Sequence, residues 1–194
     1  MRCGLFATSL QGRPAAKKNL FSRHEKTWTP ENILRVNLAG EHGATHIYRA
    51  QIAVASLFFR DMLPFLHETL NHEKRHCRLF HDMAAARSVR PCRAMTLWAL
   101  GGGLLGLSST LFGAHGVWIC TAAVEATVYR HMRSQLTYLK PRDAELYALV
   151  ATILREETGH LRYARSRAGV LTPPMRALRN AIAMATEFAV QRSF

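Results

Sequence analysis

The sequence is poor in acidic residues. It contains 13 Asp and Glu against 26 Lys and Arg, which gives a formal net charge of +13 at pH 7. A surface with this charge attracts anionic partners, either nucleic acid or the headgroups of anionic lipids. The sequence shows no nucleic-acid-binding module and no alternation of aromatic and basic residues, so we expect no nucleic-acid partner. Anionic lipid accounts for the same excess, at about 1 kcal/mol per basic residue near the surface.

Cysteine is also scarce, and its spacing is uninformative. The four cysteines form no C-x-x-C pair and no framework spacing; they are Cys3, Cys77, Cys92 and Cys120. A small fold held together by disulfides is therefore excluded, and we expect reduced, buried and inert thiols.

Acidic residues are missing altogether from residues 1–24, which carry several Arg and Lys. We interpret residues 1–28 as a basic tail, either a mitochondrial transit peptide or a bacterial N-terminal segment, and the sequence leaves both open. The remaining residues, 29–194, are long enough for one domain with a sizeable core, and a hydrophobic content of 48% argues against disorder.

No segment has the pattern of a convincing β-strand, so the sequence predicts an all-α fold. Thr29 and Pro30 form a helix start, with Thr29 as the N-cap and Pro30 in the first helical position. Prolines at 91, 141 and 173–174 separate the helical segments. We expect long helices over residues 30–59, 63–87, 116–139, 144–168 and 175–192.

Charged residues are absent from residues 94–124, where the sequence is rich in Leu and Gly. A transmembrane helix needs about 20 apolar residues, and the glycines and Ser108-Ser109-Thr110 interrupt this run. We therefore expect a short apolar helix within residues 94–113 that lies in or against a bilayer, with a buried core helix as the alternative. Residues 101–106 match G-x-G-x-x-G, but no strand precedes them, so a dinucleotide-binding fold is excluded.

Two Glu-x-x-His pairs, Glu73–His76 and Glu157–His160, are the most informative pattern in the chain. Each follows another glutamate, Glu41 or Glu125, and both spacings between the glutamates are 32 residues. Residues three apart on a helix share a face, with Cβ atoms about 5–6 Å apart. A spacing of this length suits two antiparallel helices joined by a short turn. The pattern is typical of a carboxylate-bridged di-iron centre in a four-helix bundle.

The residue types at these positions indicate which metal would bind. Carboxylates held close together repel one another unless cations neutralise them. Mixed carboxylate oxygens and imidazole nitrogens suit iron or manganese, whereas structural zinc sites are typically rich in thiolate. The alternative interpretation is that these residues form surface salt bridges or cap helices.

Several further segments between residues 33 and 169 accompany this pattern. They are Leu34-Arg35-Val36, Ala39-Gly40-Glu41, Gly43-Ala44, Ile47-Tyr48, Gln51, His72-Glu73-Lys74-Arg75-His76, Pro91, Leu97-Trp98, Cys120-Thr121-Ala122-Ala123-Val124-Glu125 and Arg155-Glu156-Glu157-Thr158-Gly159-His160. Together they resemble the demethoxyubiquinone hydroxylase family of quinone biosynthesis. The resemblance implies a ferritin-like four-helix bundle, with a membrane-contacting apolar helix between the two hairpins and a C-terminal helix.

The resemblance also implies a site with two iron ions per chain. The implied metal ligands and catalytic residues are Glu41, Glu73 and His76 at the first iron, and Glu125, Glu157 and His160 at the second, with Glu73 and Glu157 as bridging carboxylates. Tyr48 and His131 are candidates for hydrogen bonds to these ligands or for electron transfer; ordinary packed or surface positions are the alternative.

The implied activity is that of a monooxygenase that hydroxylates the ring of a polyprenylated demethoxyubiquinone-type precursor. Its co-reactants would be dioxygen and NADH-derived electrons from an unidentified donor. Other proteins of quinone biosynthesis are candidate partners. The implied location is peripheral, at the inner membrane, on the bacterial cytoplasmic or mitochondrial matrix side. One rival is a ferritin-like ferroxidase or iron-binding protein, for which an acidic surface would be expected. Another is a lipid- or nucleic-acid-binding helical protein without enzymatic activity.

The chain departs from the family pattern around the ligands. Asn37-Leu38 stands where the family usually has Asp-His, and Arg162, Arg165 and Arg167 follow His160 where acidic residues are usual. The ligands themselves are intact, so we expect metal binding to be retained. The differences should affect the surroundings of the ligands and the docking of partners.

Overall fold

A computed structural model describes residues 28–193, and within this range it contains helices and no strand, as the sequence predicts. The elements are α1 (Pro30–Phe58), the short 3-10 helix η2 (Arg60–Met62), α2 (Leu63–Ala86), α3 (Met95–Thr110), α4 (Gly113–Leu139), α5 (Ala144–Ala168) and α6 (Pro173–Gln191). α4 and α6 begin slightly earlier than expected. The predicted basic tail lies outside the described residues except for Trp28, which is buried and donates a hydrogen bond to Ser134.

Side-chain caps fix the starts of two helices that carry candidate ligands. Thr29 accepts a hydrogen bond of 3.1 Å from the backbone N–H of Asn32 at the start of α1, which confirms the predicted N-cap. Asp143 does the same for Leu146 at the start of α5, at 3.0 Å. Arg87, just after α2, pairs with Asp143 and lowers the pKa of that carboxyl. The end of α2 and the start of α5 are thereby held together.

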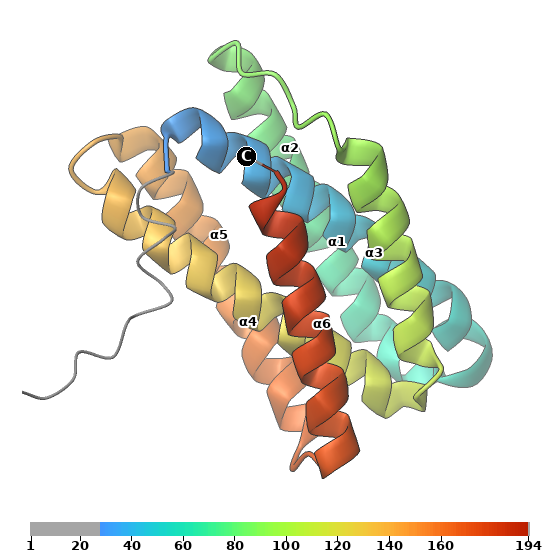
Figure 1. Cartoon of the computed structure of the whole chain (residues 1–194). Helices are drawn as coiled ribbons and strands as arrows, with labels where there is room; N and C mark the ends of the chain where they lie inside the picture. Colours follow the sequence, from blue (N-terminus) through green and yellow to red (C-terminus); the bar gives the residue numbers. More distant parts are fainter. Residues whose placement is uncertain (1–27, 194) are drawn as a thin grey trace, which may run out of the picture.

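The helices form two antiparallel hairpins, α1–α2 and α4–α5, that face each other (Figure 1). α3 packs on α1, and α6 packs on α4. The core consists of two apolar clusters, one containing Tyr48, Leu66 and Trp118, the other containing Phe80 and Leu146. On all four helices of the hairpins, the candidate ligands fall between residues of one cluster and residues of the other. The fold therefore encloses the polar candidate ligands between two apolar clusters.

Glycines let the backbone of α3 lie directly on that of α1. A Cβ atom at Gly102 would overlap the carbonyl oxygen of Gly43, and one at Gly106 would overlap that of Ile47. Gly43, two residues after Glu41, thus admits the backbone of α3. Gly40 instead has open space around it.

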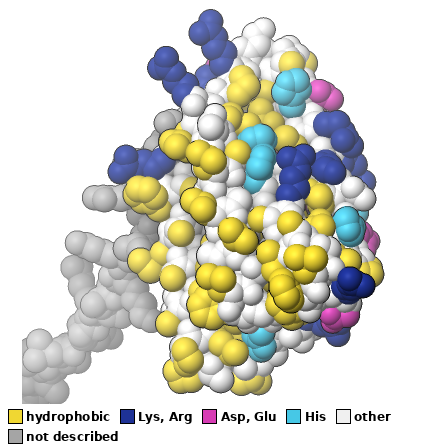
Figure 2. All heavy atoms as spheres, turned by 90° about the vertical axis from the view of Figure 1, so that its right-hand side faces the viewer, with side chains coloured by type: hydrophobic (Ala, Val, Ile, Leu, Met, Phe, Trp, Pro, Cys, Tyr) yellow, Lys and Arg dark blue, Asp and Glu magenta, His cyan; other side chains and the backbone are white. Residues whose placement is uncertain are grey.

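The opposite face of α3 is apolar and exposed. Leu97 and Leu104 are each 69% exposed, and four further large apolar side chains on and just after this helix are also exposed: Leu100, Leu107, Leu111 and Phe112. Figure 2 views the side of the molecule on which α3 lies, and hydrophobic side chains spread over much of it. A buried core helix is therefore excluded. Within residues 28–193, every helix is too short or too polar to cross a bilayer.

Candidate metal centre

The structure brings all six candidate ligands together inside the bundle. Glu41 comes from α1, Glu73 and His76 from α2, Glu125 from α4, and Glu157 and His160 from α5; all six are buried. They form two overlapping groups in which one potential ligand atom per residue lies within 4.8 Å of the others. Glu73 and Glu157 belong to both groups. Surface salt bridges and helix capping are thereby excluded as explanations of the Glu-x-x-His pairs.

Four atoms of this cluster are buried without a hydrogen-bond partner. They are Oε1 of Glu73, Oε1 of Glu157, Nδ1 of His76 and Nδ1 of His160. Nδ1 of His76 lies 2.9 Å from Oε1 of Glu157, yet the angles there are not those of a hydrogen bond. Buried polar atoms in proteins nearly always have a partner. Atoms that approach closely without bonding to one another, and that have no other partner, fit a set of donors arranged around metal ions.

The outward nitrogen of each imidazole is held by a neighbouring side chain. Nε2 of His76 lies 2.8 Å from Oε2 of Glu156, which also pairs with Arg75. Nε2 of His160 lies 3.0 Å from Nδ1 of His72. Contacts of this kind orient a metal-binding imidazole and leave its other nitrogen free for the metal. In both histidines, Nδ1 is therefore the nitrogen available to bind.

The electrostatics show the cost of holding these groups together without a cation. Burial, followed by repulsion from Glu157, raises the pKa of Glu73 and of Glu125 well above the ordinary value. Burial by itself would lower the pKa of His76, but the carboxylates of Glu157 and Glu41 outweigh it and raise that pKa to about 11. Burial would raise the pKa of Glu157, but His160 and His76 lower it. These shifts follow from several carboxylates lying close together in a buried place, an arrangement that bound cations would relieve.

The two residues suggested beside the ligands have different surroundings. Tyr48 is buried and its hydroxyl donates a hydrogen bond of 2.7 Å to Oε1 of Glu125. Burial and the nearby carboxylate of Glu125 raise the pKa of Tyr48, so its proton stays in place. His131 lies farther along α4 and contacts Glu187 of α6, with Nε2 and Oε2 2.9 Å apart. Tyr48 therefore contacts a candidate ligand, and His131 contacts α6.

A cavity of about 750 Å³ leads to the carboxylates. Its walls come from α1, α3, α4 and α6, and it reaches Glu41, Glu73, Glu125 and Glu157. The lining is mostly apolar, and Gly40 lines it without a side chain to fill the space. The cavity is large enough for a small organic molecule, since such sites typically measure about 300–1,000 Å³.

A pair of amides forms one polar part of the cavity wall. The Asn37 amide donates to Oε1 of Gln135, and the Gln135 amide donates to Oδ1 of Asn37, both at 2.9 Å. Both side chains are buried, and both line the cavity. A primary amide has two N–H groups, so each residue retains one donor after this pairing.

The sequence indicated the six inner residues of the site and Tyr48 beside them, but not His72, Glu156 or Asn37. His72 lies four residues before His76, and Glu156 directly precedes Glu157, so both spacings were visible in the sequence. The missing information was which neighbouring helix each side chain would reach. For Asn37, the partner Gln135 lies on another hairpin, and no local pattern connects the two.

The thiols match the expectation of inertness in part. Cys120 is buried, and burial raises its pKa to about 12, so this thiol stays protonated at neutral pH. Cys77 and Cys92 are partly exposed, and neither forms a disulfide with another described residue. Cys3 lies outside the described residues.

The chain is similar to one protein family and to several proteins with known names. The family described as "Ubiquinone biosynthesis protein COQ7" matches residues 29–193 of the chain. A rat protein named NADPH-dependent 3-demethoxyubiquinone 3-hydroxylase, mitochondrial, is 35% identical over 126 residues, which cover 65% of this chain and 57% of the rat protein. The human protein of the same name is 30% identical over 167 residues, covering 84% of this chain and 76% of the human protein.

A bacterial relative matches over a longer stretch. The 3-demethoxyubiquinol 3-hydroxylase of Rhodospirillum rubrum is 30% identical over 179 residues, covering 92% of this chain and 84% of the bacterial protein. The chain spans little more than half the length of the rat and mouse relatives, at 57% of each.

Proposed function

The chain belongs to the COQ7 family of ubiquinone biosynthesis proteins, and on this premise we propose that it is an oxygen-dependent di-iron hydroxylase. Its substrate would be the ring of a polyprenylated demethoxyubiquinone-type precursor, as the names of its human and bacterial relatives suggest. The observation that carries the proposal is the convergence of four buried carboxylates and two inward-facing Nδ1 atoms, several of them without hydrogen-bond partners.

The residues divide naturally between two metal ions. Glu41 and His76 would hold one iron, Glu125 and His160 the other, and Glu73 and Glu157 would bridge them, since these two belong to both groups. Bound iron would supply the redox chemistry that activates dioxygen. Carboxylate oxygens and imidazole nitrogens without thiolate fit iron.

The protein's own contribution is to bind and orient the quinone ring beside this centre. The apolar cavity would exclude water around the ring, and the open space at Gly40 would let the ring approach Glu41. The remaining N–H groups of Asn37 and Gln135 can donate to a ring oxygen. Tyr48 would keep Glu125 oriented through its hydrogen bond.

The polyprenyl tail would reach the cavity from a membrane surface. Leu97 and Leu105 of α3 line the cavity, whereas Leu100 and Leu104 of the same helix face outward. An apolar helix that lies in the interface while basic residues contact anionic headgroups explains both the exposed leucines and the charge of +13. We place the protein peripherally at an inner membrane, bacterial or mitochondrial; the rat and human relatives are named as mitochondrial, and a bacterial protein is also similar.

Electrons for the reaction would derive from a reduced nicotinamide nucleotide, consistent with the NADPH dependence in the names of the mammalian relatives. Iron storage as the main function is not favoured. An apolar cavity that leads to the carboxylates serves an organic substrate, and an acidic surface for mineral nucleation is lacking in a chain with 13 acidic residues against 26 basic ones.

The proposal is tested by hydroxylation of a short-tailed demethoxyubiquinone by the iron-loaded protein. His160→Ala should abolish turnover while circular dichroism shows an unchanged helical content. Glu68→Ala removes an exposed glutamate of α2 and serves as the control, with activity within about twofold of the parent. Undiminished turnover in His160→Ala would remove this histidine from the centre.

A further inference from the structure

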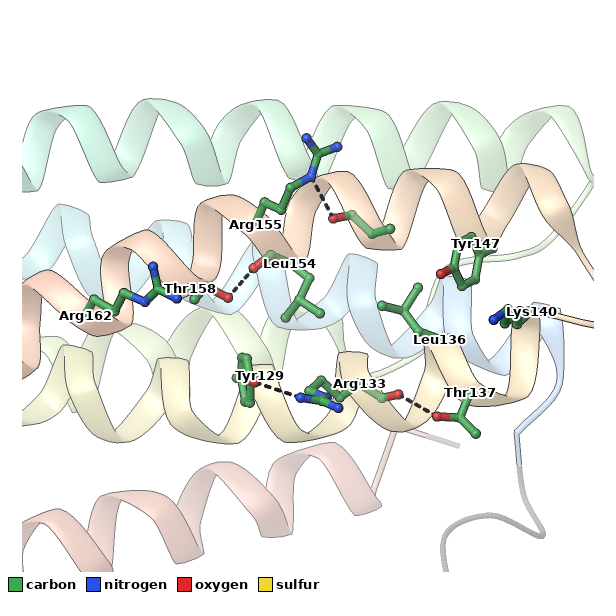
Figure 3. Close-up of a pocket in the computed structure, with 11 residues that line it drawn as sticks. Tyr129, Arg133, Leu136, Thr137, Lys140, Tyr147, Leu154, Arg155, Thr158 and Arg162 are labelled. Carbon is green, nitrogen blue, oxygen red and sulfur yellow. Dashed lines mark hydrogen bonds between the residues drawn. The ribbon is translucent and has the colours of Figure 1, made fainter.

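A second concave site lies on the outer side of the α4–α5 hairpin, away from the cavity of the metal centre. It is a groove of about 530 Å³ between the two helices, lined by Leu136, Leu154, Tyr129, Tyr147 and several basic residues (Figure 3). Neighbouring residues of α5 face the two sites: Glu157 lines the cavity, and Thr158 lines the groove. A ligand in the groove would therefore not compete with one in the cavity.

The groove has an apolar and aromatic interior. In Figure 3, Leu136 of α4 and Leu154 of α5 lie between the helices, with Tyr129 toward one end and Tyr147 toward the other. Both tyrosines are partly exposed. A flat ring would lie on the leucines and stack offset or edge-on against a tyrosine, the arrangements that aromatic pairs prefer.

Four cations border this interior, and none of them has an acidic partner among the described residues. The basic residues that line the groove are Arg133, Lys140, Arg155 and Arg162, and no Asp or Glu of residues 28–193 lines it. Some arginines elsewhere in this range do pair with acids, as Arg35 does with Glu31 and Arg87 with Asp143. The guanidinium of Arg133 donates to the hydroxyl of Tyr129 at 3.1 Å, which leaves its other N–H groups available.

We propose that this groove binds a phosphorylated ligand that carries a flat ring, the chemistry of a nucleotide. Arginine N–H groups match phosphate oxygens in pairs, and a lysine adds a mobile point charge. A concave site of this volume suits a small molecule better than a protein surface, which usually needs about 800 Å² of contact per partner. The ring would occupy the leucine and tyrosine interior, and the phosphates would lie at the basic border.

The test is isothermal titration of the full-length protein with ADP, inorganic pyrophosphate and adenosine. We expect saturable binding of one ADP per chain, tighter than either pyrophosphate or adenosine, because only ADP satisfies both parts of the groove. Arg133→Gln combined with Arg162→Gln should weaken ADP binding about tenfold or more, because hydrogen bonds between arginine and phosphate are about twice as strong as neutral ones. Tyr147→Ala should weaken ADP binding and leave pyrophosphate binding unchanged.

A matched control distinguishes ADP binding at the groove from attraction by the overall positive charge. Arg176→Gln combined with Arg179→Gln removes the same charge from exposed positions of α6 and should change ADP affinity by less than about twofold. Equal losses in the two double variants would overturn the proposal, because they would reflect net charge alone. Absence of saturable ADP binding would also overturn it, as would affinity for phosphatidylglycerol vesicles that depends on Arg133 and Arg162 without any for ADP.

Discussion

Tyr48 of α1 donates a hydrogen bond of 2.7 Å to Glu125 of α4, so a candidate ligand of one hairpin is oriented by a side chain of the other. The bond lowers the pKa of Glu125, against the larger effect of burial, and so favours the charged carboxylate that a metal requires. This hydrogen bond therefore connects the two hairpins at the centre, in addition to the proposed metal.

Tyr48→Phe should weaken ferrous iron binding about tenfold at pH 7. The phenyl ring fills the same space, but Glu125 loses a hydrogen bond to a charged group, worth about 1.5–3 kcal/mol. Anaerobic titration followed by optical absorbance measures the affinity. Tyr138→Phe, at a half-buried position of α4, is the control and should bind iron like the parent. Equal affinities for all three proteins would show that this hydrogen bond does not tune the site.

Metal-free protein should lose stability as the pH rises from 5 to 8. Glu73 and Glu125 have pKa values raised above the usual 4.5, and His76 has one raised from 6.5 to about 11. The folded state thus binds more protons than the unfolded state in this window, so stability falls as protons are lost. The depressed pKa of Glu157 acts in the opposite sense, but only below about pH 4.5.

Thermal melting at pH 5, 6, 7 and 8 measures this dependence. Each kcal/mol corresponds to about 2–4 °C for a chain of this size. Glu73→Gln, which removes one of the buried carboxylates, should flatten the curve. A melting temperature that rises steadily with pH in metal-free protein would contradict the assigned protonation.

Glu156→Leu should weaken iron binding by about 10–100-fold, because Glu156 holds the outward nitrogen of His76 at 2.8 Å. Glu156→Gln retains an acceptor oxygen and should lie between Glu156→Leu and the parent. Glu68→Leu, at an exposed position of α2, is the control. The affinities come from competition with a chelator. Parent-like affinity in Glu156→Leu would mean that the histidine is oriented by packing alone.

Leu97→Ser combined with Leu104→Ser should weaken binding to vesicles that contain anionic lipid and leave the melting temperature unchanged. Each leucine is 69% exposed, so its loss costs little within the fold but removes apolar area from the membrane contact. Leu79→Ser combined with Val170→Ser alters exposed apolar residues outside α3 and is the control. Vesicle co-sedimentation is the measurement. If the control pair reduced binding equally, α3 would not be the contact surface.

Asn37→Leu and Gln135→Met should each destabilise the fold by about 1–3 kcal/mol, because each leaves a buried amide without its partner. The double variant should cost less than the sum of the two, since it removes both amides together. Urea unfolding measures these differences. In the iron-loaded double variant we also expect a raised KM for the quinone with kcat within about twofold, because the amides would bind the ring. If the two destabilisations simply added in the double variant and the KM were unchanged, the amides would neither depend on each other nor bind the ring.

The fold was predictable because its signals are local. The cap at Thr29 and the prolines between helices mark the segments, and periodic apolar residues distinguish helix from strand. Which face of α3 packs inward was harder to predict, since its glycines and its leucines both count as apolar residues. Contact with the backbone of Gly43 determines that the glycines face inward, and this contact joins segments far apart in the chain.

In the site, too, features set by local helix geometry were predictable, and features set by packing between helices were not. Glu73 and His76 are three residues apart on one helix, so their shared direction follows from helix geometry. The repeated spacing of 32 residues extended this inference to both hairpins. By contrast, the contacts of Asn37 with Gln135, and of His76 with Glu156, depend on how the hairpins pack. Tertiary packing, which helical periodicity does not encode, decides these partners.

The most direct test of the central claim is an anaerobic titration of metal-free protein with ferrous iron, monitored by bound metal per chain. A carboxylate centre formed by Glu41, Glu73, His76, Glu125, Glu157 and His160 predicts saturation at two iron ions per chain, and loss of at least one of them in Glu41→Ala. Saturation that is absent, or that is unchanged by this substitution, would contradict it.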